Sequence, residues 1–216
     1  MMVAHDLKEP LLNVASCANM LAEDEVLEVE ERKQMLRGLH SSADRLRILV
    51  NELFEFARLG GGQRMEWVDL TVLTSEIKSD LRCLLRRTGA HLSIGAMPSI
   101  KAARVGMRVI LGNLIENAIK YGRAEEPVIV TLNAERTASG WLFSVGDNGM
   151  GIASEHRSSL FDPFRRLTLQ GEGAGLGLSH VMRVVEEHNG WIDVESEVGV
   201  GSTFRVFIPD ERGLAG

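Results

Sequence analysis

Apolar residues recur at steps of three and four near the start of the chain, which is the spacing of one face of an α-helix. This first stripe consists of Leu7, Leu11, Val14, Ala18 and Leu21. We expect the helix to end near Ala22. The acidic stretch 23–31 interrupts the stripe and is predicted to hold a turn.

From Arg32 onward the helical pattern resumes with two adjacent apolar stripes. One consists of Met35, Leu39, Ser42, Leu46, Leu49, Leu53 and Phe56, and the other of Leu36, Ala43, Val50 and Ala57. A single antiparallel partner cannot cover both stripes, and buried apolar surface contributes roughly 25 cal/mol per Å². We therefore expect the hairpin to dimerise into a four-helix bundle, the alternative being a hairpin packed on its own second domain. Gly60, Gly61 and Gly62 then predict a short flexible linker.

The rest of the chain mixes strand and helix patterns. Strands are predicted at EWVDL (66–70), at HLSIG and MPSI around Gly95, at VIVTLNAE (128–135), WLFSVGD (141–147), WIDVES (191–196) and STFRVFIP (202–209). The strands 128–135 and 141–147 are expected to pair antiparallel. The strands 191–196 and 202–209 are expected to form a closing hairpin across Gly199 and Gly201.

Helices are predicted over 71–87 with Thr71 as N-cap, over 103–121, and from Gly177 to about His188, where Asn189 and Gly190 end the helix. The order predicts an α/β sandwich with one sheet covered by helices. The fold class is thus α+β, with a helical dimerisation domain at 1–62 and a sandwich domain at 63–216.

Composition narrows the possible partners. The chain of 216 residues is 44% hydrophobic, carries a formal charge of −6, and has no clustered Lys/Arg run. These features argue against nucleic acid or an anionic membrane as its main partner. No apolar run approaches the ~20 residues that span a bilayer. Cys17 and Cys83 have no metal-ligand spacing, so we expect two reduced thiols in a cytoplasmic protein.

Three segments together predict a nucleotide site: NLIENAIKYG (113–122), DNGMGI (147–152) and GEGAGLGLSHVMRVVEEHNG (171–190). Asn113, Asn117 and Lys120 recur at helical spacing, so two amides and an ammonium share one face. Amide oxygen suits Mg²⁺, and the ammonium suits phosphate. A pair such as Asn113 and Asn117 is common on the exposed face of any amphipathic helix. The third residue, Lys120, favours a nucleotide site over that interpretation.

Glycines complete the pattern. Gly173, Gly175 and Gly177 have no Cβ and open a helix, so the backbone N–H groups there can approach an anion. Gly149 and Gly151 allow the chain to turn sharply after Asp147. An Asp-Asn turn between two elements is the simpler interpretation of Asp147 alone.

In order and approximate spacing, these segments resemble the N, G1 and G2 boxes of the sensor histidine kinases. LFDPFRRL (160–167) stands where the family has its F box, and HDLKEPL (5–11) resembles the H box in the form found in phytochrome-like kinases. The resemblance covers nearly the whole chain. It implies a GHKL (Bergerat) ATP-binding domain, ATP and Mg²⁺, a homodimer and a response regulator partner. Because the H box stands almost at Met1, it also implies a shortened chain whose input domain lies outside it.

The resemblance assigns the nucleotide to Asn113, Asn117, Lys120, Tyr121, Asp147, Gly149, Gly151, Arg166, Gly173, Gly175, Leu176 and Gly177. It makes Asn117 the Mg²⁺ ligand and Asp147 the partner of the exocyclic amine of adenine. A carboxylate at the end of an apolar strand is costly without such a partner. Residues 153–172 would form a lid anchored by Phe161 and Phe164.

By the same resemblance His5 is the phosphorylated histidine. Asp6 can hold Nδ1–H and leave Nε2 free to attack the γ-phosphoryl group, and Pro10 should kink the helix just after the site. Glu9 stands where many relatives carry Thr or Asn, and its charge would repel an aspartyl phosphate, so we expect weak phosphatase activity. The other histidines, expected to be structural, are His40, His91, His156, His180 and His188.

Two rival functions fit parts of the pattern. One is an ATPase of the gyrase and mismatch-repair type, but such enzymes carry a catalytic Glu where this chain has Asn113. The other is a non-enzymatic phosphotransfer scaffold with a decayed nucleotide site, which the intact Asn117, Lys120 and Asp147 argue against. No GxxxxGK[ST] motif occurs, which excludes a P-loop kinase. The prediction is a kinase core that autophosphorylates His5 and passes the phosphoryl group to a response regulator aspartate.

Overall fold

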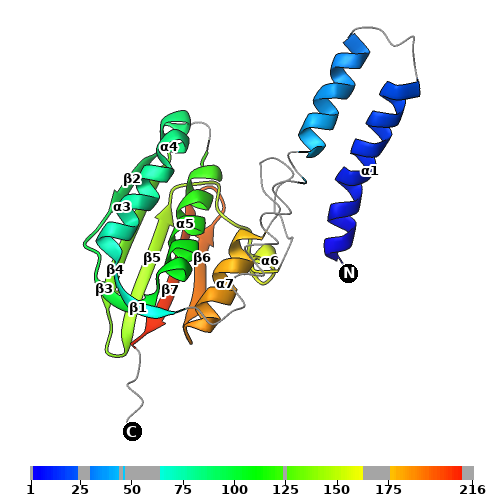
Figure 1. Ribbon diagram of the computed structural model, residues 1–216. Coiled ribbons are helices and arrows are strands. Elements are labelled where there is room, and N and C mark those ends of the chain that lie inside the picture. The colour runs from blue at the N-terminus through cyan, green and yellow to red at the C-terminus, as the bar shows by residue number, and fades with distance from the viewer. Residues whose placement is uncertain are drawn as a thin grey trace.

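The computed structural model describes residues 2–23, 30–43, 46, 64–123, 126–162 and 176–210 (Figure 1). Its first part is helical, with α1 spanning Met2–Glu23 and residues 30–43 helical as well. The predicted end of the first helix is confirmed, and α1 continues through Pro10. The second helix has begun by Glu30, so the turn is shorter than predicted. The double stripe after residue 46 and the glycine linker lie outside the described residues.

The second part is built on a mixed sheet of five strands in the order β2-β4-β5-β7-β6. Their bounds are β2 His91–Ile94, β4 Ile129–Arg136, β5 Gly140–Asp147, β6 Trp191–Glu197 and β7 Gly201–Pro209. β2 pairs parallel with β4, and the other neighbours pair antiparallel. The predicted pairing of the two central strands and the closing hairpin are confirmed.

A separate two-stranded antiparallel sheet is formed by β1 Met65–Asp69 and β3 Ser99–Ala103. The prediction placed a strand over MPSI, but Met97 and Pro98 precede β3. Proline has no N–H to give to a ladder. Its carbonyl is used instead, because Pro98 O accepts a hydrogen bond from Leu70 N at 3.1 Å.

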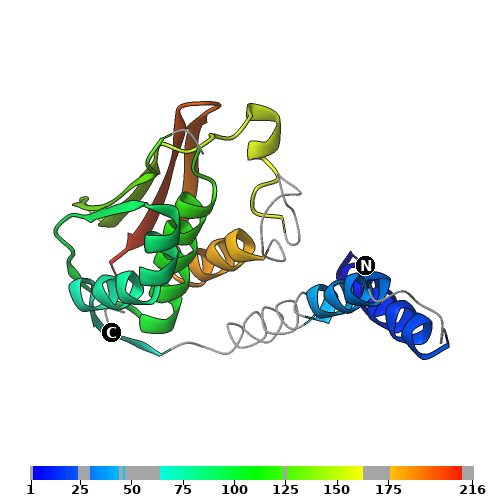
Figure 2. The same cartoon turned by 90° about the horizontal axis from the view of Figure 1, so that it is seen from above.

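The helices of this part are α3 Leu70–Asp80, α4 Arg82–Thr88, α5 Arg104–Lys120, α6 Ser154–Arg157 and α7 Gly177–Glu187. The view from above shows α3, α5 and α7 on the same side of the sheet (Figure 2). The sandwich, the helix over 103–121 and the helix after Gly177 are therefore confirmed. Asn189, in the left-handed conformation with φ 55°, follows the last of them as predicted.

The single helix predicted over 71–87 is wrong in two respects. Its N-cap is Asp69, whose carboxylate accepts hydrogen bonds from Thr71 N at 2.8 Å and Val72 N at 3.4 Å. The Thr71 hydroxyl instead donates to Met97 O at 3.2 Å. Helical geometry is lost at Leu81, where ψ is 2°, so the segment divides into α3 and α4.

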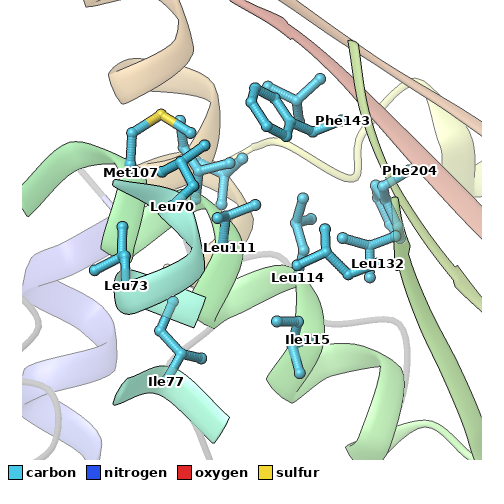
Figure 3. Packing of buried hydrophobic residues seen from close by; sticks show 14 of the residues in the cluster. Leu70, Leu73, Ile77, Met107, Leu111, Leu114, Ile115, Leu132, Phe143 and Phe204 are labelled. Carbon is cyan, nitrogen blue, oxygen red and sulfur yellow. The ribbon is translucent and has the colours of Figure 1, made fainter. Parts of the chain in front are cut away.

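The core lies between the helices and the sheet (Figure 3). Residues labelled there are Leu70, Leu73, Ile77, Met107, Leu111, Leu114, Ile115, Leu132, Phe143 and Phe204, and all are buried. Since α5 fills this space with one apolar face, its polar residues are left at the edge of the core. The candidate site begins on that edge.

Candidate functional site

α5 carries Asn113 and Asn117 at half-buried positions and Lys120 at an exposed one. The Asn113 side chain is fixed, because Nδ2 donates to Val109 O, one turn earlier, at 2.8 Å. Its other amide atom, Oδ1, is directed toward the start of α7. A Cβ placed on Gly177 would lie 2.6 Å from that oxygen.

The N-terminus of α7 therefore lies directly beside Asn113, and α5 and α7 run side by side (Figure 1). Leu176, the N-cap residue, is only 2% exposed and makes no side-chain cap hydrogen bond. The first turn contains no acidic residue. No side-chain cap is seen at this helix end in the described part of the chain, and its first N–H groups, with the positive end of the helix dipole, give it the character of an anion site.

Lys120 forms an ion pair that the motif did not predict. Its Nζ lies 2.7 Å from Oε1 of Glu116, four residues earlier on α5. A nucleotide phosphate would have to draw the ammonium away from this carboxylate or share it. Its signal in the sequence is the i,i+4 spacing of Glu116 and Lys120, which brings the two side chains together on a helix.

The oxygen atoms here fit a hard divalent cation. Asn113, Asn117 and Glu116 carry amide or carboxylate oxygens on the same helix, and Mg²⁺ prefers oxygen ligands. Within the described segments no three His, Cys, Asp or Glu residues cluster as a metal cage. Mg²⁺ commonly binds through one or two protein groups plus phosphate oxygens, so this donor set is compatible with it.

At the other end of the site, Asp147 closes β5 as a half-buried carboxylate. Burial raises the pKa of this carboxyl, and hydrogen bonds from the Gly149 and Ser202 N–H groups oppose that rise. Both hydrogen bonds end on Oδ1, at 2.7 Å and 3.2 Å. Among the described residues none donates to Oδ2, so that oxygen is left for a further donor such as an amine.

The loop 147–151 is packed tightly between two neighbours. A Cβ on Gly149 would lie 2.5 Å from Tyr121 O, and one on Gly151, where φ is 70°, would lie 2.0 Å from Glu197 O. Met150 N also donates to Tyr121 O at 3.0 Å. The backbone of Tyr121 thus joins the end of α5 to this loop, while its side chain is 38% exposed.

Asn148 is a structural residue. Its Oδ1 accepts from Ile129 N at 2.8 Å, and its Nδ2 donates to Pro127 O at 3.0 Å. The Asp-Asn pair is therefore divided, with the carboxylate facing the site and the amide tying the loop to the start of β4.

Sequence reasoning missed two residues at this end. Ser202 donates its N–H to Asp147, and only the β5–β7 register, which places these two residues opposite each other, could have revealed it. Arg123, just beyond the asparagine-rich motif, hydrogen-bonds to Asn148 O and Gly199 O. No motif pointed to Arg123.

Several predicted site residues cannot be placed. His5 and Asp6 lie in α1, but their side chains are outside the description, as are Arg166, Gly173, Gly175 and Phe164. Phe161 is half-buried and packs against the core.

His188 is structural as predicted, since its Nε2 accepts from Ala103 N at 3.1 Å and its Nδ1 lies 2.7 Å from Val184 O. None of the described helices has the length and hydrophobicity needed to cross a bilayer.

Two protein-family models match the chain. The His Kinase A (phospho-acceptor) domain matches residues 1–62. The family of histidine kinase-, DNA gyrase B- and HSP90-like ATPases matches residues 102–212. The two matched regions contain the H-box-like segment and the three nucleotide segments, respectively.

Individual proteins show the same similarity. The chain is 29% identical over 211 residues to the phytochrome-like protein Cph1 of Synechocystis sp., covering 95% of this chain but only 28% of that protein. The structure of full-length ShkA in complex with AMPPNP is 28% identical with a TM-score of 0.66, covering 96% of this chain and 46% of ShkA. Histidine kinase ThkA, solved in complex with response regulator protein TrrA, shares the fold at 21% identity with a TM-score of 0.74, covering 97% of this chain and 60% of ThkA.

Proposed function

The chain belongs to the two-component sensor histidine kinases, and we propose that it uses ATP to phosphorylate His5 and passes the phosphoryl group to a response regulator aspartate. One observation carries most of the weight. Tyr121 links a chain segment with Asn113, Asn117 and Lys120 to a loop that begins with Asp147. The groups suited to phosphate and metal and the carboxylate suited to adenine thereby lie at two ends of one continuous structure.

Asp147 is proposed to recognise the adenine. The ionised carboxylate accepts a hydrogen bond from the exocyclic amine on Oδ2, while Oδ1 keeps its two backbone donors. Gly149 and Gly151 keep the loop close to Tyr121 and Glu197, where a side chain would collide with backbone. The base would thus meet a pre-arranged acceptor.

Asn113, Asn117, Lys120 and the N-terminus of α7 are proposed to hold the phosphates. Asn117, with Asn113 beside it, would hold Mg²⁺, which would neutralise phosphate charge during transfer. Lys120 would move from Glu116 to a phosphate oxygen, and the Gly177 N–H lies at a helix end that favours anions. The Gly173 and Gly175 backbone and Arg166 are proposed to complete this end.

In the transfer step, the lone pair of His5 Nε2 forms a bond to the γ-phosphorus while the bond from that phosphorus to the β,γ-bridging oxygen breaks. ADP leaves with the bond electrons. Asp6 holds Nδ1–H and stabilises the charge on the ring. The phosphoryl group then passes to a carboxylate oxygen of the response regulator, which returns His5 to its neutral form.

The assembly is proposed to be a homodimer formed through the helices of residues 1–62, with residues 63–216 as the catalytic domain. The ThkA complex with TrrA provides a precedent for a response regulator partner. We place the reaction in the cytoplasm, in keeping with two cysteines that are both free thiols.

Incubation of the full chain with γ-labelled ATP and Mg²⁺ tests this proposal. We expect label that survives base and is lost in acid, because a phosphorus–nitrogen bond behaves in this way and a phosphoserine does not. Excess ADP should suppress the labelling. Release of free phosphate without protein labelling would instead support an ATPase, and no nucleotide consumption at all would support the scaffold.

A further inference from the structure

Arg123 joins three separate pieces of chain at the adenine end. Its Nε donates to Asn148 O at 3.1 Å, its Nη1 to Gly199 O at 2.8 Å, and its Nη2 to Glu126 at 2.9 Å. The side chain is 28% exposed, so two of these bonds are made to backbone carbonyls in a partly desolvated place. A guanidinium suits this task because its donors form a rigid planar fork.

The two carbonyls belong to the segments that also hold Asp147. Gly149 N, from the loop that contains Asn148, donates to Asp147 Oδ1. Ser202 N donates to the same oxygen, and Ser202 lies at the start of β7, three residues after Gly199 of the β6–β7 connection. Arg123 therefore bridges, from outside, the two segments whose N–H groups converge on one carboxylate oxygen.

These segments are in close contact. Gly199 N donates to Met150 O at 2.8 Å, and a Cβ on Gly201 would lie 2.0 Å from Asp147 O. A small shift of the β6–β7 connection relative to the loop would thus disturb Gly149 N in the loop and the start of β7, where Ser202 N lies. Arg123 opposes such a shift through both carbonyls, together with the Ser196 hydroxyl, which accepts from Ile152 N at 2.8 Å and donates to Gly201 O at 2.9 Å.

We propose that Arg123 is a positioning residue for adenine recognition, which fixes the loop and the β6–β7 connection so that Asp147 presents its free oxygen to the base. The inference rests on the proposed nucleotide site. It adds a specific residue, outside the recognised motifs, on which the affinity for adenine nucleotides depends.

The proposal has a pH signature. The Gly149 and Ser202 N–H groups oppose the rise that burial causes in the pKa of Asp147. If Arg123 is removed, these donors are held less firmly, so the pKa of the carboxyl should rise further. Adenine binding needs the ionised form, so the loss of binding on acidification should then occur at a higher pH than in the wild type.

The domain should still fold without Arg123. The hydrogen bonds from Met150 N to Tyr121 O and from Ile129 N to Asn148 remain to anchor the loop. Arg136 offers a matched control. It is the last residue of β4, paired with Asp210 at 2.7 Å and placed over the Trp141 ring at 5.4 Å.

The test is calorimetric titration of the full chain with ADP, without Mg²⁺, over a pH series from about 4.5 to about 8. The variants are Arg123→Gln, Arg123→Lys and Arg136→Gln, each with a thermal melt. We expect Arg123→Gln to weaken ADP about tenfold at neutral pH and to move the acid midpoint upward by about half a unit. Lysine keeps a charged donor but lacks the planar set of donors of the guanidinium, so Arg123→Lys should weaken ADP binding about threefold. Arg136→Gln should match the wild type.

Two results would overturn the inference while leaving the nucleotide site intact: wild-type affinity in Arg123→Gln, or weaker binding with an unchanged acid midpoint, which would indicate general loss of stability. If Arg123→Gln fails to fold, Arg123→Lys decides by the same two readouts. Absence of ADP binding by the wild-type chain would reject the proposed function itself and this inference with it.

Discussion

At the scale of single residues, the two ends of the candidate site use different chemistry. Asp147 is a half-buried carboxylate whose pKa is raised by burial, so it holds its charge at a cost and gains from a donor. Asn113 and Asn117 are neutral amides on α5, and Asn113 lies beside the N-terminus of α7. This difference allows substitutions to separate adenine recognition from phosphate and metal binding.

Asp147→Asn is expected to weaken ADP binding about thirtyfold or more both with and without Mg²⁺, because the amide cannot reproduce the charged acceptor. Asn117→Ala should weaken binding only when Mg²⁺ is present. Calorimetric titration with ADP in the two conditions measures both effects. Equal losses in both conditions for both variants would contradict this division.

The wild type should also lose ADP affinity on acidification. An ordinary aspartate has a pKa of about 3.9. Because burial raises the pKa of Asp147, its carboxyl is protonated at a higher pH, and the neutral acid is a poor acceptor for the amine. The loss should be absent in Asp147→Asn, whose weak binding has no such titration. A flat pH profile in the wild type would show that the charge of Asp147 is not used.

Gly177→Ala tests the contact between α7 and Asn113. The added Cβ would fall 2.6 Å from Asn113 Oδ1, and that side chain is tied to Val109 O, so its amide must be displaced. Alanine is a good helix residue, and we expect the fold to remain intact. ATP-dependent labelling should fall about tenfold while ADP binding without Mg²⁺ changes little. Unchanged labelling would mean that Asn113 needs no fixed position.

At the scale of elements, the long periodic segments were predictable and the joints were not. The helix over 103–121 and the paired strands around 140 follow from apolar spacing, which continues over many residues. The break at Leu81 leaves no mark in that spacing, since Leu81 itself packs against the core. The cap at Asp69 was missed because a hydroxyl at Thr71 and a carboxylate two residues earlier are both good cap residues.

Asp69→Ala is therefore expected to lower the unfolding free energy of the chain by about 1 kcal/mol, because two N–H groups at the start of α3 lose their acceptor. Thr71→Ala, the substitution that the sequence would have favoured as the cap test, should cost less, since its hydroxyl bonds only to Met97 O. Urea unfolding of the two variants gives the comparison. A larger effect for Thr71→Ala would contradict the assigned cap.

The candidate site was predictable as a set of segments but not as a set of contacts. Glycine and asparagine spacing identified the residues on α5 and the loop after β5. The role of Ser202 depends on strand register, and that of Arg123 on where a distant turn lies. A local sequence pattern predicts neither the strand register nor the position of the turn, because both contacts join residues more than fifty positions apart.

At the scale of the whole molecule, the helical part leaves apolar side chains without cover in a single chain. Leu11, Leu12, Met20 and Leu36 are exposed there. Burial of such residues in a second copy is the simplest way to remove them from water. Light scattering should then give a molar mass about twice the 23.8 kDa of one chain.

Leu36→Asp should shift this equilibrium toward the monomer, whereas Trp67→Ser, which removes an exposed apolar residue on β1, should leave the dimer unchanged. A monomer for the wild type at micromolar concentration would contradict the four-helix arrangement.

The proposed kinase activity requires that His5 receives the γ-phosphoryl group, so labelling of His5→Gln is the most direct measurement. The substitution leaves residues 63–216 unchanged, and ADP affinity measured in parallel verifies that the nucleotide site is intact. We predict that the wild type gains acid-labile label from γ-labelled ATP and that His5→Gln gains none while still binding ADP. Acid-labile label of wild-type intensity on His5→Gln would contradict the central claim.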